Sequence, residues 1–350
     1  MYNTDKPALV TGGCGFVGRH LTRRLLKEGY AVWLVDDCST GQHPDAWLPD
    51  TSEREELAPG VVRYGGDNDV VFVHGDARDF FSARVELGGL EVPAFGDVFH
   101  FAAVVGGRAT IDGNPMAVAI DLALDALCFN WAVEVKPDRL LYASSSAAYP
   151  VDLQGEGGAV ALKETDIAFG GRLGQPDMTY GWSKLTGEYL ARIAHDHYGL
   201  HTACVRPFSG YGEEQDLSYP VPSIALRAAR GDAPITVWGS GLQGRDFVHI
   251  DDCVEAMLRI LDRVSDGSGI NIGSGTLVNF REVAALFVEL AGYEAEVKPI
   301  EDKPVGVHSR FADTTHMAEL LDWRPEISLE EGFGRVLEVA RQRLADGATG

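Results

Sequence analysis

The feature that most constrains this chain is a glycine-rich segment near its N-terminus, Thr11-Gly-Gly-Cys-Gly-Phe-Val-Gly18. It follows a short apolar run, residues 7–11, and precedes residues 16–28, in which apolar side chains recur at helical spacing. This pattern predicts a strand, a tight turn and a helix. A second apolar run at residues 31–35 leads to Asp36, which completes a strand–helix–strand unit of about 30 residues.

Such a turn has the composition of a pyrophosphate-binding loop, in which backbone N–H groups and the positive end of a helix dipole face the ligand. A carboxylate at the end of the second strand accepts hydrogen bonds from the adenine ribose and repels the additional phosphate of NADP, so Asp36 favours NAD. Asp37 is the alternative ribose ligand. The residues expected to bind the cofactor here are Gly12, Gly15, Phe16, Val17, Gly18 and Asp36.

Further apolar runs in the first 206 residues alternate with helical patterns. Strands are expected at residues 70–73, 97–101, 139–143 and 201–205, and helices at residues 115–135 and 178–198. Regular alternation of this kind is typical of an α/β protein with a Rossmann-type doubly wound parallel sheet. Gly-rich insertions at residues 39–69 and 153–177 interrupt it, and the first is expected to be an exposed excursion between strands.

A chain of 350 residues exceeds the size at which one core keeps growing. Beyond Arg206 the alternation gives way to short helices and strands separated by proline-bearing loops. We therefore expect an NAD-binding domain over residues 1–206, rejoined by parts of about 230–255 and 268–298. Residues 207–350 are expected to form mainly a smaller, discontinuous α/β substrate-binding domain.

The segment at residues 115–135 is apolar nearly all the way round, which is more than one face of a sheet can cover. Its second face is therefore expected to meet another subunit, giving a homodimer through this helix and the helix at residues 178–198. Complete burial within its own chain is the alternative.

Charge and cysteine usage exclude several classes of partner. The formal net charge of −22 disfavours nucleic acid and anionic membranes, because both bind basic patches; the acid excess fits either solubility or a saline cytoplasm. Apolar runs fall short of a membrane span and the N-terminus lacks a signal-peptide pattern, so a cytoplasmic location is expected. Five scattered cysteines without a Cys-x-x-Cys motif argue against disulfides and zinc, and no metal is expected.

The segment Tyr180-Gly-Trp-Ser-Lys184 places a phenol and an ammonium on one helical face. A phenol with an ordinary pKa of about 10 becomes a usable base when a cation stabilises its anion. Ser144, Ser145 and Ser146 end the expected strand at residues 139–143, at the sheet edge where ligands bind in this architecture. One of these hydroxyls can share a proton with a substrate and with Tyr180, although serines also simply terminate strands.

These motifs, taken in order, resemble the extended short-chain dehydrogenases/reductases of the NAD-dependent sugar epimerase/dehydratase group, and the resemblance covers nearly the whole chain. The matching pieces are residues 11–18, Gly75-Asp76, residues 100–103, residues 144–149, residues 180–184, residues 239–252 and Ala312-Asp313 through Trp323-Arg-Pro325.

The resemblance implies site residues beyond the motifs. Ser145 is the catalytic serine, because the family spacing Ser-x-x-x-Tyr runs from it to Tyr149, and Lys184 also holds the nicotinamide ribose. Arg245 matches an arginine that grips the substrate diphosphate, for which a planar guanidinium is suited. The remaining cofactor residues implied are Asp76, which contacts the adenine, Ala102, Ala103 and Pro207. The substrate residues implied are Gly107, Arg108, Ser145, Ser146, Ser209, Arg245, Arg310 and Lys303, of which Lys303 has a surface cation as its alternative role.

The resemblance also implies the chemistry. Tyr180 would remove the C4-hydroxyl proton of a nucleotide-linked sugar while hydride passes to NAD, which gives a 4-keto sugar. Dehydratases and decarboxylases of the group carry an acidic residue soon after the catalytic hydroxyl, whereas this chain has Ser146, Ala147 and Ala148.

Several segments resemble GDP-mannose 3,5-epimerases, but Ala147 replaces their key cysteine, and residues 212–219 contain acids but no lysine. Epimerisation at C4, as in UDP-galactose 4-epimerases, needs neither group and is therefore favoured. A 3,5-epimerase or another sugar-nucleotide oxidoreductase or dehydratase is the alternative enzyme. The intact Ser145, Tyr180 and Lys184 argue against a silent NAD-binding scaffold. Ser209 replaces a family asparagine that meets the nucleotide, so UDP, GDP and ADP all remain open.

Overall fold

Short runs rich in Val, Leu and Ala form the strands of one nine-stranded sheet. The computed structural model describes residues 4–66, 69–85, 87, 89–105, 108–156, 158–303 and 305–347, with backbone only at residues 108–110. The strand order is β13-β8-β7-β6-β1-β2-β5-β4-β3. The parallel strands are β1 (Ala8–Thr11), β2 (Val32–Asp36), β5 (Val70–His74), β6 (Asp97–His100), β7 (Arg139–Ala143), β8 (Thr202–Pro207) and β13 (Asp266–Ile272).

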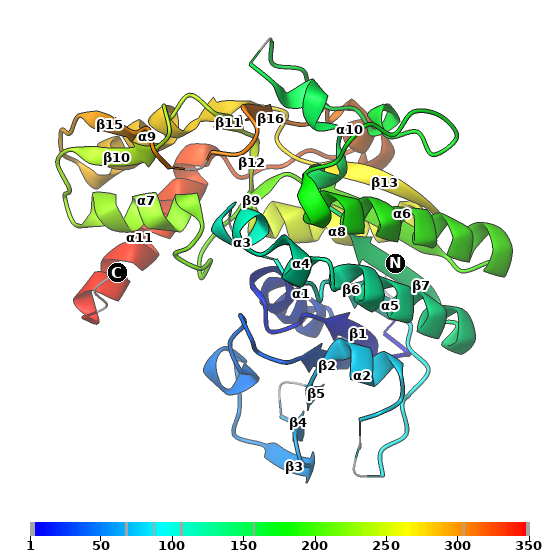
Figure 1. The fold of residues 1–350 in the computed structure, drawn as a ribbon. Helices are drawn as coiled ribbons and strands as arrows, with labels where there is room; N and C mark the ends of the chain where they lie inside the picture. The colour runs from blue at the N-terminus through cyan, green and yellow to red at the C-terminus, as the bar shows by residue number, and fades with distance from the viewer. Residues whose placement is uncertain are drawn as a thin grey trace.

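Successive side chains of each strand enter two different cores, because they point to opposite faces of the sheet. In β1, Val10 packs on one face, and the helices there are α1 (Phe16–Lys27), α8 (Ile250–Arg263) and α10 (Thr315–Leu321). Leu9 packs on the other face, with α2 (Ala77–Phe81), α5 (Asp121–Val135) and α6 (Met178–Tyr198). Helices on both faces (Figure 1) confirm the predicted Rossmann-type doubly wound parallel sheet.

The chain runs from β1 outward through β2 and β5 and then crosses back to place β6 on the other side of β1. The strand order therefore reverses at the boundary between β1 and β6. In open parallel sheets, ligands bind in the crevice outside the carboxyl ends of the strands at this switch point. The loops that follow Thr11 and His100 border that crevice.

The prediction that residues 39–69 form an exposed excursion is wrong. This segment contains η1 (Pro44–Ala46) and a hairpin of β3 (Arg54–Ala58) and β4 (Val61–Tyr64), which extends the sheet antiparallel to β5. Gly60 turns the hairpin with φ +78°, in the left-handed region that favours glycine. Val61 and Tyr64 are fully buried, so the hairpin is part of the core.

The segment at residues 115–135 is not one helix, as expected, but two, α4 (Pro115–Val118) and α5, after α3 (Arg108–Gly113). By length and composition alone it is apolar enough to cross a membrane. In the fold it behaves as a core helix, because Leu124, Cys128 and Ala132 are buried against the sheet. α6 covers the expected residues 178–198 without a change of bounds.

The C-terminal residues form a smaller unit beside the large sheet (Figure 1). Its core joins α7 (Pro220–Ala229), α9 (Phe280–Ala291), α11 (Leu329–Ala345), β10 (Ile235–Trp238) and β15 (Val297–Ile300). The short strands nearby are β9 (Ser209–Tyr211), β11 (Gly244–Arg245), β12 (Phe247–His249), β14 (Val278–Asn279) and β16 (Ser309–Arg310). Of the segments expected to rejoin the large sheet, α8 and β13 do so, whereas β10 and α9 pack in the smaller unit.

Candidate active site

The glycine-rich turn after β1 lies against the backbone of the loop that follows β6. Gly12 has φ +71°, and a Cβ there would lie 2.7 Å from the backbone nitrogen of Ala102. A Cβ on Gly18 would lie 2.2 Å from the carbonyl oxygen of Gly12. Gly15 precedes α1 and offers no side-chain cap, so the first N–H groups of the helix remain available to an anion. Glycine is therefore required at positions 12 and 18, and the turn leads into a helix N-terminus of the kind that binds pyrophosphate.

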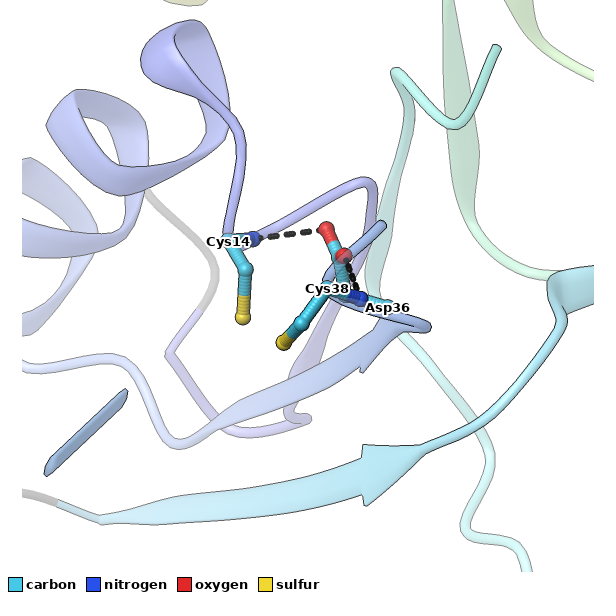
Figure 2. A group of neighbouring side chains, drawn as sticks. All are labelled: Cys14, Asp36 and Cys38. Atoms are coloured by element: carbon cyan, nitrogen blue, oxygen red, sulfur yellow. Dashed lines mark hydrogen bonds between the residues drawn. The ribbon is translucent and has the colours of Figure 1, made fainter. Parts of the chain in front are cut away.

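Asp36 lies at the end of β2, under the same turn. Its carboxylate accepts hydrogen bonds from the backbone N–H groups of Cys14, at 2.9 Å, and Cys38, at 2.8 Å (Figure 2). Burial raises the pKa of this carboxyl, and the two hydrogen bonds oppose the rise. The neighbouring Asp37 instead caps the backbone of Ser39. Asp36, rather than Asp37, is therefore built into the floor of the turn.

The strand carrying the serines and the helix carrying Tyr180 meet through the backbone. η2 (Ser146–Ala148) follows β7, and Ala147 accepts a hydrogen bond from the N–H of Asp177, the residue before α6, at 2.9 Å. A Cβ on Gly181 would lie 2.3 Å from the same Ala147 oxygen, so glycine is required for this approach. Ser145 caps η2 by accepting from the Ala147 N–H at 3.1 Å. The helix end with Tyr180 thus lies against the turn with Ser145.

Lys184 is buried one helical turn after Tyr180. Its Nζ lies 5.8 Å from the centre of the Tyr180 ring and 5.2 Å from the centre of the Tyr142 ring. Burial lowers the pKa of this ammonium, but the nearby charges of Asp125, Tyr180 and Asp121 outweigh burial and leave the pKa above its usual value. Lys184 therefore stays protonated and places its charge beside the Tyr180 ring.

Asp121, which the sequence analysis missed, contributes part of that negative charge. It is fully buried in the first turn of α5, and one carboxylate oxygen accepts the N–H of Val104 at 2.7 Å. The other oxygen has no hydrogen-bond partner in the described structure. Burial raises the pKa of Asp121 to about 6, although the charge of Lys184 opposes the rise. A carboxylate at positions i and i+4 of an apolar helix, as at Asp121 and Asp125, is the signal that could have identified it.

A buried chain of hydrogen bonds connects the glycine-rich turn to Lys184. The Thr11 hydroxyl is 2.7 Å from His100 Nδ1, and His100 Nε2 is 3.2 Å from Asp125. Asp125 also accepts a hydrogen bond from the Tyr142 hydroxyl at 2.6 Å. These hydrogen bonds, which begin next to the glycine-rich turn, hold the Tyr142 ring in place, and Lys184 lies over that ring.

A second buried network of hydrogen bonds holds the segment after β7, which carries Ser144. Ser144 donates a hydrogen bond to Glu188 of α6, and Arg206 pairs with both Glu188 oxygens at 2.8 and 2.6 Å. Arg206 also donates to the Tyr149 hydroxyl at 3.0 Å. The Ser144 hydroxyl is therefore held by Glu188, whereas Ser145, one residue later, is only partly buried.

The two arginines expected at the diphosphate are neighbours across a small sheet. Arg245 of β11 is the register partner of Arg310 of β16, and parallel register partners extend from the same face of a sheet. Arg310 donates to Gln154 at 2.5 Å and to Asp177 at 2.9 Å, whereas Arg245 donates to the carbonyl oxygens of Gly244 and Val305.

The other expected residues fall into four groups. Lys303 is exposed, with its Nζ 5.5 Å from the centre of the Trp238 ring. Asp76 caps α2 and pairs with Arg78, which lowers the pKa of the Asp76 carboxyl. The residues at the carboxyl edge of the sheet or just beyond it are Ala102, Ala103, Ser146, Pro207 and Ser209. Gly107 lies outside the described residues, and only the backbone of Arg108 is described, at the start of α3.

The acidic residues after β9 all have structural partners. Glu213 accepts from His249 at 2.9 Å, and Glu214 pairs with Arg23 of α1, also at 2.9 Å. The pairing with His249 holds the pKa of Glu213 below its usual value against the effect of burial. Asp216 caps the backbone of Ser218 at 2.8 Å.

Known proteins of the same kind match almost the whole chain. The model of the NAD dependent epimerase/dehydratase family matches residues 8–273. GDP-mannose 3,5-epimerase 1 of Oryza sativa subsp. indica is 28% identical over 332 residues, covering 93% of this chain and 79% of that protein. UDP-glucose 4-epimerase of Mycolicibacterium smegmatis is 25% identical over 338 residues, covering 96% and 98%.

A solved structure agrees in fold. The crystal structure of a Thermotoga maritima UDP-glucose 4-epimerase with UDP-glucose superposes with a TM-score of 0.79 at 26% identity, covering 97% of this chain and 99% of that one. A tight glycine turn that leads into the N-terminus of α1, with Asp36 beneath it, fits the dinucleotide. The family match spans well over half of the chain, so this protein belongs to the NAD-dependent epimerase/dehydratase family and uses NAD as its cofactor.

Proposed function

We propose that this protein is a nucleotide-sugar epimerase that inverts C4 through a transient 4-keto sugar. The observation that carries the proposal is the pairing of Tyr180 with a buried, protonated Lys184, next to Ser145 and at the carboxyl edge of an NAD-binding sheet. A phenol held beside a permanent cation can accept a proton near neutral pH. Bound NAD would accept the hydride from C4 and return it to the other face of the sugar.

Each of these side chains has one proposed task. Tyr180 takes the proton of the C4 hydroxyl and later gives it back. Ser145 shares a hydrogen bond with that hydroxyl, since its own backbone partner leaves the O–H proton free to donate. Lys184 stabilises the phenolate and holds the nicotinamide ribose, while Asp36 holds the adenine ribose. Arg245 binds the diphosphate of the substrate.

Inversion at C4 is favoured over inversion at C3 and C5 because the second reaction needs an acid/base pair beside the keto group. Ala147 offers no ionisable group in the place of the expected cysteine. Glu213 and Glu214 are held by His249 and by Arg23 of α1, which leaves neither poised over a substrate. Relatives named for both reactions exist, so the choice rests on these residues.

The experiment that tests this proposal is incubation of the protein with UDP-, GDP- and ADP-sugars in heavy water, followed by proton NMR of the products. We expect one C4 epimer pair to interconvert without deuterium uptake into the ring. Deuterium at C3 or C5 would contradict inversion at C4. No conversion of any sugar would favour the NAD-binding scaffold instead.

We further propose that the protein works as a homodimer in the cytoplasm. Apolar side chains remain exposed on two neighbouring helices. They are Met116 of α4, which is 77% exposed, and Trp182 and Tyr189 of α6, which are 45% and 48% exposed. α5 and α6 pack side by side on the outer face of the sheet (Figure 1), so a second copy could cover both. Trp182→Glu should raise the dimer dissociation constant about 30-fold or more, as loss of an aromatic anchor does.

Light scattering after size-exclusion chromatography measures that change. Trp238→Glu is the matched control, because Trp238 is 44% exposed but lies on β10 of the smaller unit. An equal effect of both substitutions, or a wild-type protein that is monomeric at all concentrations, would contradict the proposed interface.

A further inference from the structure

Two thiols and one carboxylate meet beneath the glycine-rich turn, in an arrangement that NAD binding does not explain. Cys14 belongs to the turn, and Cys38 follows β2 by two residues. Their sulfur atoms and a carboxylate oxygen of Asp36 all lie within 4.8 Å of one another. Figure 2 shows the two thiol side chains lying next to each other, with the Asp36 carboxylate hydrogen-bonded between their backbones.

The spacing is close to what a metal ion needs. Zinc binds cysteine sulfur at about 2.3 Å and carboxylate oxygen at about 2.1 Å, so two donors of a tetrahedral ion lie roughly 3.6 to 3.8 Å apart. Donor atoms within 4.8 Å of one another therefore need to move by about 1 Å at most. Each Asp36 oxygen already accepts one backbone N–H, and a carboxylate oxygen has a second lone pair with which to bind an ion.

The negative charge of Asp36 lies beside both thiols. Burial raises the pKa of the Cys14 thiol far above its ordinary value, and the negative charge of Asp36 raises it further. Burial also raises the pKa of the Cys38 thiol, and the negative charge of Asp36 raises it further. Disulfide formation and metal binding both require thiolates, so an ion that binds here must displace two tightly held protons. The same negative environment attracts a positive ion, which replaces the thiol protons.

The surrounding chain makes the site accessible from one side. Cys14 is fully buried, and the loop from Cys38 onward closes over it, since Gln42 donates to the Cys14 carbonyl at 3.0 Å. Cys38 is only partly buried, so an ion can enter past it. With an ion bound, one Asp36 oxygen has both lone pairs occupied, by the ion and by a backbone N–H, so fewer acceptor positions remain for the ribose hydroxyls.

We propose that Cys14, Asp36 and Cys38 form a site for a thiophilic divalent cation of the zinc class, and that this ion competes with NAD. Binding forms two metal–sulfur bonds and one metal–oxygen bond, and the two thiol protons pass to solvent, so no oxidant is needed. The competition, though not the metal binding, rests on the proposed role of Asp36 at the adenine ribose.

Cadmium is the probe, because sulfur–cadmium charge transfer gives an ultraviolet absorption band. The full-length protein, freed of NAD and reduced, is titrated with cadmium alone and again with saturating NAD. We expect one cadmium ion per chain, and a Cys38→Ala variant that binds at least tenfold more weakly. Cys253→Ala, which removes a buried thiol from α8, should bind like the wild type. Because two protons leave, the affinity should rise about 100-fold per pH unit while both thiols are protonated.

Saturating NAD should weaken cadmium binding at least tenfold. Absence of the charge-transfer band, or equal binding by Cys38→Ala and Cys253→Ala, would overturn the site. A band that NAD does not affect would overturn the competition. Thermal unfolding of each variant tests whether it is folded. Cys38 is the thiol chosen for substitution because it is only partly buried, so the core should stay intact. The spectroscopic readout is independent of sugar turnover, so a failure of the proposed epimerase activity leaves this result interpretable.

Discussion

The cofactor side and the substrate side of this molecule are built in different ways. On the cofactor side, one continuous segment from Thr11 to Asp36 supplies the turn, the helix end and the carboxylate proposed to bind the ribose. On the substrate side, the candidate arginines lie on β11 and β16, more than 60 residues apart in the chain, and meet only through sheet pairing. A local motif can be identified from sequence spacing, whereas a site assembled from distant strands depends on the fold as a whole.

The largest effect is expected at the junction of the two sides, where we propose that Tyr180 meets both cofactor and sugar. Tyr180→Phe should lower kcat about 100- to 10,000-fold, because the proposed acid/base is removed. The affinity for NAD should stay within about threefold, since the turn and Asp36 are untouched. Steady-state kinetics and NAD titration measure the two quantities. Sugar turnover that survives the substitution would show that another group moves the proton.

Asp121 tests how far the cofactor side extends beyond its motif. Its pKa of about 6 in the folded protein exceeds the ordinary value of 3.8, so the folded state holds its proton more tightly than the unfolded state. This group therefore destabilises the protein as pH rises from about 4 to about 6, by about 3 kcal/mol in total, and the cost persists above pH 6.

Asp121→Asn should accordingly raise the free energy of unfolding of the NAD-free protein at pH 8 and leave it nearly unchanged at pH 4. Urea unfolding across this pH range measures the difference. Asp346→Asn, at the exposed end of α11, is the control and should alter neither value. If the free energy of unfolding of the variant depends on pH as that of the wild type does, the pKa of Asp121 is not raised in the folded protein.

The glycine turn tests the local half of the comparison. Gly18→Ala places a Cβ 2.2 Å from a backbone oxygen, so the turn must open, at a cost of about 1–3 kcal/mol in stability and with weaker NAD binding. Gly334→Ala, in open space on α11, should instead stabilise the protein by about 0.5–1 kcal/mol. Calorimetry and NAD titration of both variants separate the steric effect from a general effect of glycine replacement. Equal NAD affinities would mean that the turn does not approach the dinucleotide.

The substrate side should respond more weakly and in a different parameter. Arg245→Ala should raise KM about tenfold with little change in kcat, as expected for loss of one charge-assisted contact to a remote phosphate. Arg310→Ala should also lower the melting temperature, because Arg310 joins Gln154 to Asp177 at the start of α6. Identical behaviour of the two variants in kinetics and unfolding would remove the distinction between a binding and a bridging arginine.

Features that depend on local sequence could be predicted, whereas features that depend on packing between distant segments could not. The bounds of α6 and β7 agree with the predicted ones, because helical and buried-strand periodicities are local. The hairpin at Arg54–Tyr64 was missed, since its strands are short and are stabilised by pairing with β5 rather than by their own pattern. Glu188 and Arg206 lack any sequence motif, and only the packing of α6 on β8 makes them a buried pair. Asp121 lies between these two cases. A carboxylate in an apolar helix is visible in the sequence, but the proximity of Asp121 to Lys184 is not.

The proposed reaction requires that the hydrogen on C4 leave the sugar as hydride and return to the same carbon, while Tyr180 takes and returns the proton of the C4 hydroxyl. The direct measurement uses the nucleotide-sugar that the protein converts, deuterated at C4, with NMR of the epimer formed in ordinary water. The account predicts that the epimer keeps its deuterium at C4, because the hydride is stored on the cofactor and handed back. Replacement of that deuterium by solvent hydrogen would contradict it, since the hydrogen would then have left as a proton.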